Sequence, residues 1–64
     1  MANSPHDHPE TLLTIRDVAA ICRVSDKTVR RWIETQTLLA TRLGAQWRIR
    51  RPDLDLFIRD GLRR

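Results

Sequence analysis

Apolar side chains recur at intervals of three and four residues in two stretches of the chain, which is the period of an amphipathic helix. The first stretch covers residues 15–22, and Thr14 and Asp17 have the spacing of a capping box at its start. The second covers residues 26–36 and follows Ser25, a favoured N-cap residue. The pattern therefore predicts two helices joined by a tight turn.

The period changes to two between residues 38 and 50, as expected for strands. The alternating residues are Thr41, Arg42 and Leu43 in a first run, and Trp47, Arg48, Ile49 and Arg50 in a second. Residues 44–46 separate the runs, and Gly44 supplies the backbone freedom of a hairpin turn. The sequence predicts a β-hairpin with apolar side chains on one face and its arginines on the other.

A third helix is predicted after the hairpin. Pro52 suits its first position, an apolar face is formed by Leu54, Phe57 and Ile58, and Gly61 is expected to end it. The expected fold class is therefore mainly α with a small β-hairpin.

The chain has 64 residues, enough for one domain that buries about 60% of the surface exposed on unfolding. Residues 1–11 are mostly polar with two prolines and are expected to form a disordered arm. Residues 12–60 form the predicted domain, and residues 61–64 a basic tail. The absence of a long apolar run predicts a cytoplasmic protein with no membrane segment.

The sequence offers little for metal or redox chemistry. The single cysteine, Cys22, cannot form an internal disulfide and lies in a helical apolar pattern, so it is expected to be a core residue. His6, Asp7 and His8 lack the further His or Cys ligands of a closed metal site. Neither a metal nor a cofactor is expected.

The positive charge is concentrated in the middle of the chain. Residues 23–51 contain eight Lys or Arg and two Asp or Glu, an excess of six positive charges. Residues 1–22 have an excess of two negative charges, and residues 52–64 are balanced. This distribution favours a polyanionic partner for the central segment.

The second predicted helix buries Val29, Trp32 and Ile33 at positions i, i+3 and i+4. Its outward face is polar and basic, and comprises Asp26, Lys27, Thr28, Arg30, Arg31 and Glu34. Two helices joined by a tight turn, the second of them basic, are the arrangement of a helix-turn-helix, whose second helix enters the major groove of DNA. Core packing is expected for both Trp32 and Trp47 rather than stacking on bases.

Segments 13–19, 24–33 and 43–49, together with Asp53-Leu54, resemble the excisionase-type, MerR-related DNA-binding domain. The run from Thr28 to Trp32 is similar to the recognition helix of phage excisionases. The resemblance implies a winged helix-turn-helix with its second helix in the major groove and its hairpin wing at the adjacent minor groove or backbone. The positions that match the DNA-contacting ones of the family are Lys27, Thr28, Arg30 and Arg31.

The sequence departs from the family pattern in two places. Family members often carry arginine at the wing tip, where this chain has Gly44-Ala45-Gln46. Phosphate contacts are therefore expected from the strand arginines Arg42, Arg48 and Arg50. Thr37 replaces a glycine common after the second helix, which predicts a looser exit from that helix.

The expected function is sequence-specific binding of double-stranded DNA by a small excisionase-like protein that directs an integrase to excise a mobile element and also regulates transcription. A MerR-like transcriptional regulator on the same scaffold is the alternative. A protein-interaction module that uses the basic face is an alternative of another class. Self-association along repeated DNA sites, an integrase or RNA polymerase as protein partner, and association with the nucleoid are expected; enzymatic activity is not, because no catalytic set of residues is present.

Overall fold

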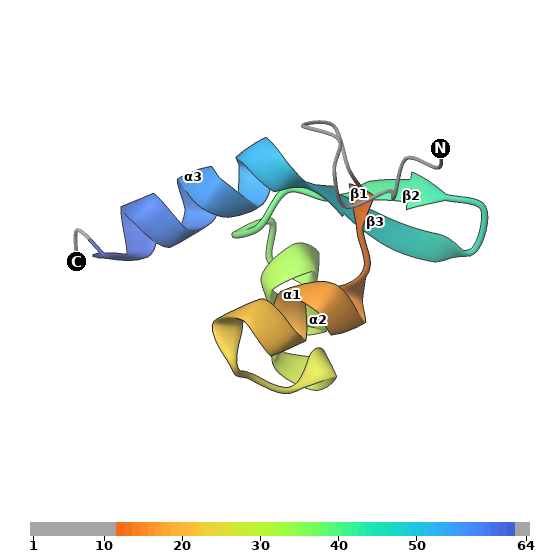
Figure 1. Cartoon of the computed structure of the whole chain (residues 1–64). Helices are drawn as coiled ribbons and strands as arrows, with labels where there is room; N and C mark the ends of the chain where they lie inside the picture. The colour runs from red at the N-terminus through yellow and green to blue at the C-terminus, as the bar shows by residue number, and fades with distance from the viewer. Residues whose placement is uncertain (1–11, 63–64) are drawn as a thin grey trace, which may run out of the picture.

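The two predicted helices are α1 (Ile15–Cys22) and α2 (Asp26–Glu34) of the computed structural model, which describes residues 12–62 (Figure 1). Predictions about residues 1–11, His6 and His8 among them, and about residues 63–64 lie outside these described residues. The capping box is confirmed: the amide of Asp17 donates to Thr14 Oγ1 and the amide of Thr14 donates to Asp17 Oδ2, both at 3.0 Å. Helix α1 therefore begins where the sequence predicts.

The turn between the helices is tight because its first residue adopts a left-handed conformation. Arg23 has φ 60°, and the amide of Val24 donates to the carbonyl of Ala19 at 2.9 Å. Ser25 is the predicted N-cap of α2, since its Oγ accepts from the amide of Thr28 at 3.1 Å. These bonds satisfy backbone groups that the two helix ends would otherwise leave unpaired.

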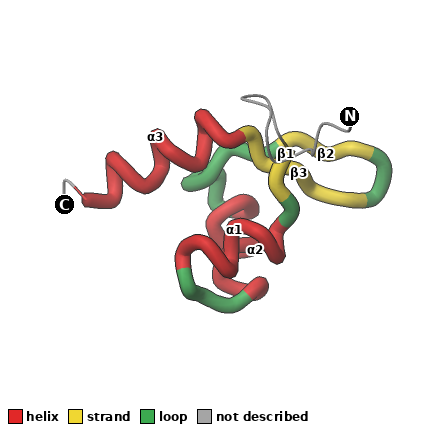
Figure 2. Tube along the Cα trace, viewed as in Figure 1, coloured by secondary structure: helices red, strands yellow, loops and turns green. Residues whose placement is uncertain are grey.

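Three antiparallel strands form a small sheet in the order β1-β3-β2 (Figure 2). Strand β1 (Leu12–Leu13) pairs with the end of β3 (Gln46–Arg50), and β2 (Thr41–Leu43) pairs with its beginning. Strand β1 was not predicted, because two residues are too few to show a period. Its effect is to place β3 at the centre of the sheet.

The prediction of a hairpin is confirmed, but the expected placement of its arginines on a single face is wrong. The turn contains two residues, Gly44 and Ala45, so Leu43 pairs with Gln46 and Arg42 pairs with Trp47. Residues directly opposite each other share a face of the sheet. A three-residue turn would have placed Leu43 opposite Trp47; the shorter turn shifts the register by one residue and moves Arg42 to the face of Trp47.

Helix α3 (Arg51–Leu62) follows β3 without a loop and leads away from the sheet on the side opposite to the hairpin tip (Figure 1). The expectation that Gly61 ends this helix is wrong, since the helix continues to Leu62. Near its start, Arg51 Nε lies 3.2 Å from Asp55 Oδ1 in an ion pair one helical turn long. The ring of Phe57 lies 4.7 Å from that of Trp32, which joins α3 to α2.

The core lies where α1, α2, the sheet and the start of α3 meet. Its buried members are Leu13, Val18, Ala19, Val29, Ile33, Leu38, Ile49 and Leu54. Trp32 and Trp47 are half-buried and pack against this cluster, which confirms that their apolar surface serves the core. Cys22 also packs against it, and burial raises the pKa of the thiol, so the thiol stays protonated near neutral pH. Cys22 is a structural residue, as predicted.

The exit from α2 is tighter than the sequence indicates. Helix α2 ends at Glu34 rather than Gln36, and Gln36 takes the left-handed conformation with φ 61°. The amides of Thr37 and Leu38 then both donate to the carbonyl of Trp32, at 2.8 and 3.1 Å. The position that favours glycine is therefore Gln36, and the expectation of a loose exit at Thr37 is wrong.

Replacement of Gln36 by glycine is expected to stabilise the domain. A residue other than glycine in the left-handed conformation destabilises the folded state by roughly 1–2 kcal/mol, and glycine removes this strain. Glycine also stabilises the unfolded chain by about 0.5–1 kcal/mol, because its backbone has more conformational freedom there. The net gain, on the order of 0.5 kcal/mol, corresponds to a rise in Tm of roughly 2–4 °C by circular dichroism. Thr37→Gly is the matched control: it should lower Tm, because Thr37 has no positive φ and its Oγ1 lies 2.9 Å from Thr35 Oγ1. A higher Tm for Thr37→Gly than for Gln36→Gly would contradict this account.

Two helices joined by a tight turn, a two-stranded hairpin and a third helix make a winged helix-turn-helix, in which β2 and β3 are the wing. The predicted fold class is confirmed. None of the helices within residues 12–62 is both long enough and apolar enough to cross a membrane.

Candidate nucleic-acid interface

The basic side chains of α2 lie on two different sides of the helix. Lys27 and Arg31 are four residues apart, exposed, and opposite the buried Val29 and Ile33. Arg30 is also exposed but lies on the flank that faces the wing, where it lines a cleft. The sequence placed Arg30 and Arg31 together on one face, whereas the structure separates their directions.

Thr28 is half-buried at the start of α2, and its hydroxyl has a structural partner. Thr28 Oγ1 lies 3.0 Å from Ser25 Oγ, the atom that caps the helix. To make the predicted DNA contact, the Thr28 hydroxyl would have to bind DNA in addition to Ser25 Oγ or in place of it.

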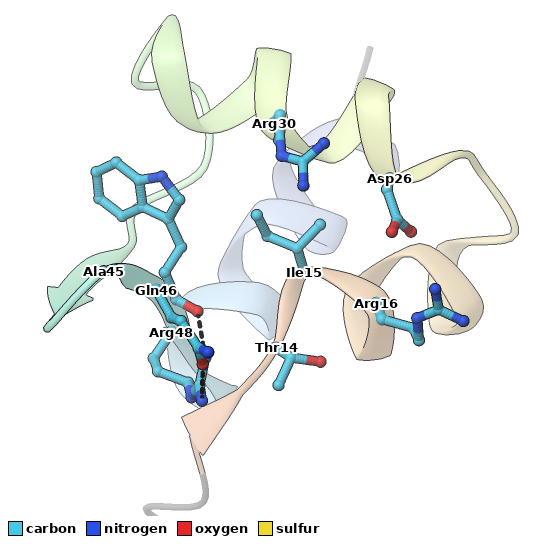
Figure 3. A pocket seen from close by; sticks show the side chains of 9 residues that line it. Thr14, Ile15, Arg16, Asp26, Arg30, Ala45, Gln46 and Arg48 are labelled. Carbon is cyan, nitrogen blue, oxygen red and sulfur yellow. Dashed lines mark hydrogen bonds between the residues drawn. The ribbon is translucent and has the colours of Figure 1, made fainter.

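A cleft of about 400 Å³ opens between the first turn of α1, the flank of α2 and the wing (Figure 3). Its lining contains three arginines from three elements: Arg16 of α1, Arg30 of α2 and Arg48 of β3. Figure 3 shows Arg30 reaching from α2 toward Ile15, with Asp26 beside Arg16 at the other side of the opening. The cleft is thus predominantly cationic, with one carboxylate at its edge.

Arg48 is held in place by its own strand. Its Nη2 donates to Gln46 Oε1 at 2.6 Å, and its Nη1 donates to the backbone carbonyl of Trp47 at 2.9 Å (Figure 3). Both acceptors are neutral, so the guanidinium keeps its full charge while its orientation is restricted. Arg48 presents a fixed cation to the cleft.

The other two predicted wing arginines lie elsewhere. The guanidinium carbon of Arg42 lies 5.2 Å from the ring centroid of Trp47, in cation–π range on the face opposite to Arg48. Arg50 ends β3, where it pairs with Leu12 of β1, and is exposed. The structure therefore brings Arg30 and Arg48 to one cleft and leaves Lys27, Arg31, Arg42 and Arg50 outside its lining.

Arg16 and Gln46 line this cleft but are not among the site residues predicted from the sequence. Arg16 lies within residues 1–22, where acidic residues predominate, and Gln46 lies in the segment predicted to be the turn. A signal for Arg16 was present, because it lies in the first turn of α1 and outside the apolar stripe of residues 15, 18, 19 and 22. Nothing in the sequence indicated that the wing lies beside this turn.

No group of three or more His, Cys, Asp or Glu side chains within the described part of the chain could hold a metal ion. The ionisable side chains of the cleft are arginines and one aspartate, a set suited to binding an anion. Arginine forks bind phosphate oxygens and the O6 and N7 atoms of guanine through paired hydrogen bonds.

Comparison with protein families matches residues 12–61, nearly the whole described region, to the helix-turn-helix domain, a family of excisionase-like DNA-binding domains. The chain belongs to this helix-turn-helix family. No significant match was found among curated proteins or among solved structures. The match spans every element of the helix-turn-helix domain from β1 through all but the last residue of α3.

Membership of this family connects the basic surfaces of the helix-turn-helix protein with DNA binding. Domains of the family bind DNA and are typically not enzymes. Its α2 occupies the place of the recognition helix, and the hairpin occupies the place of the wing.

Proposed function

We propose that this helix-turn-helix protein binds double-stranded DNA sequence-specifically, with α2 in the major groove. The observation that carries the proposal is the exposed pair Lys27 and Arg31, which project from the side of α2 opposite to the core. An α-helix fits the major groove, where an arginine fork pairs with guanine O6 and N7. Among described residues, neither side chain has an ion pair or hydrogen bond that would hold it back from a ligand.

The wing would contact the DNA beside the groove that α2 occupies. Arg48 and Arg50 alternate with Trp47 and Ile49 along β3, so they share the face of the wing that also carries Gln46. The tip consists of Gly44 and Ala45, which offer no cationic side chain to a minor groove. Backbone contacts by the strand arginines are therefore favoured over readout of bases by the tip.

In the cell, such a protein would serve as an excisionase, an architectural factor that helps an integrase to excise a mobile element. The family match supports the DNA-binding part of this role. A small module of this kind covers roughly 600–1,000 Å² of protein surface on DNA, which gives weak binding to a single site. Several copies on repeated sites, in contact with an integrase, would supply the missing affinity. These activities would place the protein with the nucleoid.

The test is selection from a pool of randomised duplexes, followed by titration of the selected duplex and a scrambled duplex of equal length. Enrichment of one motif, and binding to it at least about 1,000-fold tighter than to the scrambled duplex, would support the proposal. Equal affinity for both duplexes would overturn it and would favour a protein partner for the basic face.

A gel-shift assay on attachment-site and promoter fragments distinguishes the cellular roles. Stepwise complexes on repeated sites beside an integrase gene, and stimulation of excision by that integrase, would support an excisionase. Binding only upstream of a promoter, with changed transcription from it, would instead indicate a MerR-like regulator.

A further inference from the structure

We infer that the cleft between α1, α2 and the wing seats one backbone phosphate of the bound DNA, with Arg16 as an additional phosphate ligand and Gln46 as the positioning residue for Arg48. This inference rests on the proposed function and deepens it. It assigns a role to two residues outside the recognition helix that were not among the site residues predicted from the sequence.

The first argument is convergence of charge. Arg16, Arg30 and Arg48 come from three separate elements and line the same cleft, with Asp26 as the one acidic residue in the lining (Figure 3). Neither Arg16 nor Arg30 forms an ion pair or side-chain hydrogen bond with any other residue in the range 12–62. Three cations that line one opening repel each other, and an anion bound there relieves that repulsion. A phosphodiester carries one negative charge on two oxygens that guanidinium groups bind well.

The second argument is location. The cleft lies on the flank of α2 between the recognition helix and the wing, not on the outward face that carries Lys27 and Arg31. If α2 enters the major groove and the wing lies beside the adjacent groove, the DNA strand that separates the two grooves must pass between them. A backbone phosphate is then the group that reaches the cleft, and base edges are not.

The third argument is that hydrogen bonds within the wing preorganise the Arg48 guanidinium. Gln46 Oε1 and the Trp47 carbonyl take one hydrogen bond from each terminal nitrogen, at 2.6 and 2.9 Å. A guanidinium has five N–H donors, so three remain for a phosphate. Because its orientation is already set, Arg48 loses less side-chain entropy on binding than a free arginine does. Gln46 thereby acts on DNA through Arg48 and needs no DNA contact of its own.

The contribution of Arg16 is tested by the dependence of affinity on salt. Each phosphate contact removed lowers the slope of log K against log salt by about 1, which reduces the affinity lost between 50 and 200 mM salt by roughly 3-fold. Arg16→Ala is expected to show this smaller slope and to weaken binding to selected and scrambled duplexes by the same factor, roughly 5- to 20-fold. The matched control is Arg59→Ala, because Arg59 is an exposed arginine of α3 outside the cleft and its removal should leave both slope and affinity unchanged.

The positioning role of Gln46 is tested by a double-mutant cycle with Arg48. Gln46→Ala should weaken binding about 3-fold in the wild-type background and have no effect in an Arg48→Ala background, because its action passes through Arg48. Thermal unfolding of each variant verifies that it is folded at the temperature of the binding assay. Equal losses in both backgrounds would overturn the positioning role.

A neutral methylphosphonate placed at successive positions of the selected duplex identifies the phosphate in the cleft. At one position the methylphosphonate should lower the affinity of the wild-type protein but should not further lower that of Arg16→Ala. Inorganic phosphate alone, titrated to millimolar concentration, should produce no saturable change in the NMR signals of the cleft arginines; saturable binding would mean a site for the free ion. If the protein selects a DNA motif but Arg16→Ala leaves the salt slope unchanged, the cleft assignment fails and the proposed function stands. If no DNA motif is selected, the proposed function itself fails.

Discussion

Arg31→Ala should lower the sequence preference of the protein about 5- to 150-fold while leaving its fold intact. Arg31 is exposed on the side of α2 opposite to the buried Val29 and Ile33, where a major groove would lie. Loss of a bidentate arginine–guanine pair removes about 1–3 kcal/mol, which is roughly 5- to 150-fold in affinity for the selected duplex. Fluorescence anisotropy measures the affinity for the selected duplex and the affinity for the scrambled duplex. We expect the difference between the two affinities to narrow, because the loss falls mainly on the selected duplex.

Arg31→Lys separates the shape of the side chain from its charge. Lysine keeps the positive charge but lacks the planar fork, so the affinity for scrambled DNA should persist while the base preference falls. A fresh selection with this variant should show a relaxed preference at one base position and an unchanged motif elsewhere. A motif identical to that of the wild type would show that Arg31 contacts the backbone rather than a base.

Leu54→Ala should bring the domain close to unfolding at ordinary temperature. Leu54 is 0% exposed and belongs to the core cluster that joins α3 to the other elements. Truncation of a buried leucine removes roughly 2–5 kcal/mol, and a chain of this size has a total stability near the lower end of about 5–15 kcal/mol. Because 1 kcal/mol shifts the Tm of a small domain by roughly 4–8 °C, the expected decrease is at least about 10 °C.

Leu56→Ala is the matched control for this experiment. It makes the same chemical change two residues further along α3, where the side chain is 48% exposed. We expect a change of about 1 kcal/mol or less in the free energy of unfolding, since much of the leucine surface already contacts water. Similar decreases in Tm for the two variants would contradict the position of α3 in the core.

Local signals in the sequence predicted the helical part of this fold well. The caps at Thr14 and Ser25 depend on residues three positions apart, and the apolar periods of α1 and α2 are each contained within one short segment. The turn at Arg23 follows from the two helices it joins. Such interactions can be inferred without knowing where the rest of the chain lies.

The remaining features depend on contacts between distant residues or on a single residue of register. Whether the wing turn has two or three residues decides which face Arg42 occupies, and its sequence does not distinguish these cases. Leu12 and Leu13 become a strand only because β3 lies beside them. The cleft combines Arg16 with Arg48, residues separated by most of the domain, so neither segment alone predicts the site.

The direct junction of β3 and α3 has a mechanical consequence. Arg50 ends the central strand and Arg51 begins the helix, so no flexible linker separates the wing from α3. The buried Ile49 and Leu54 anchor both sides of this junction in the same core. The wing and α3 should therefore move together as one rigid body. A fluorescent protein or enzyme fused after α3 through a rigid helical connection would keep a constant angle to the wing, which makes this domain a suitable rigid adaptor for orienting a cargo on DNA.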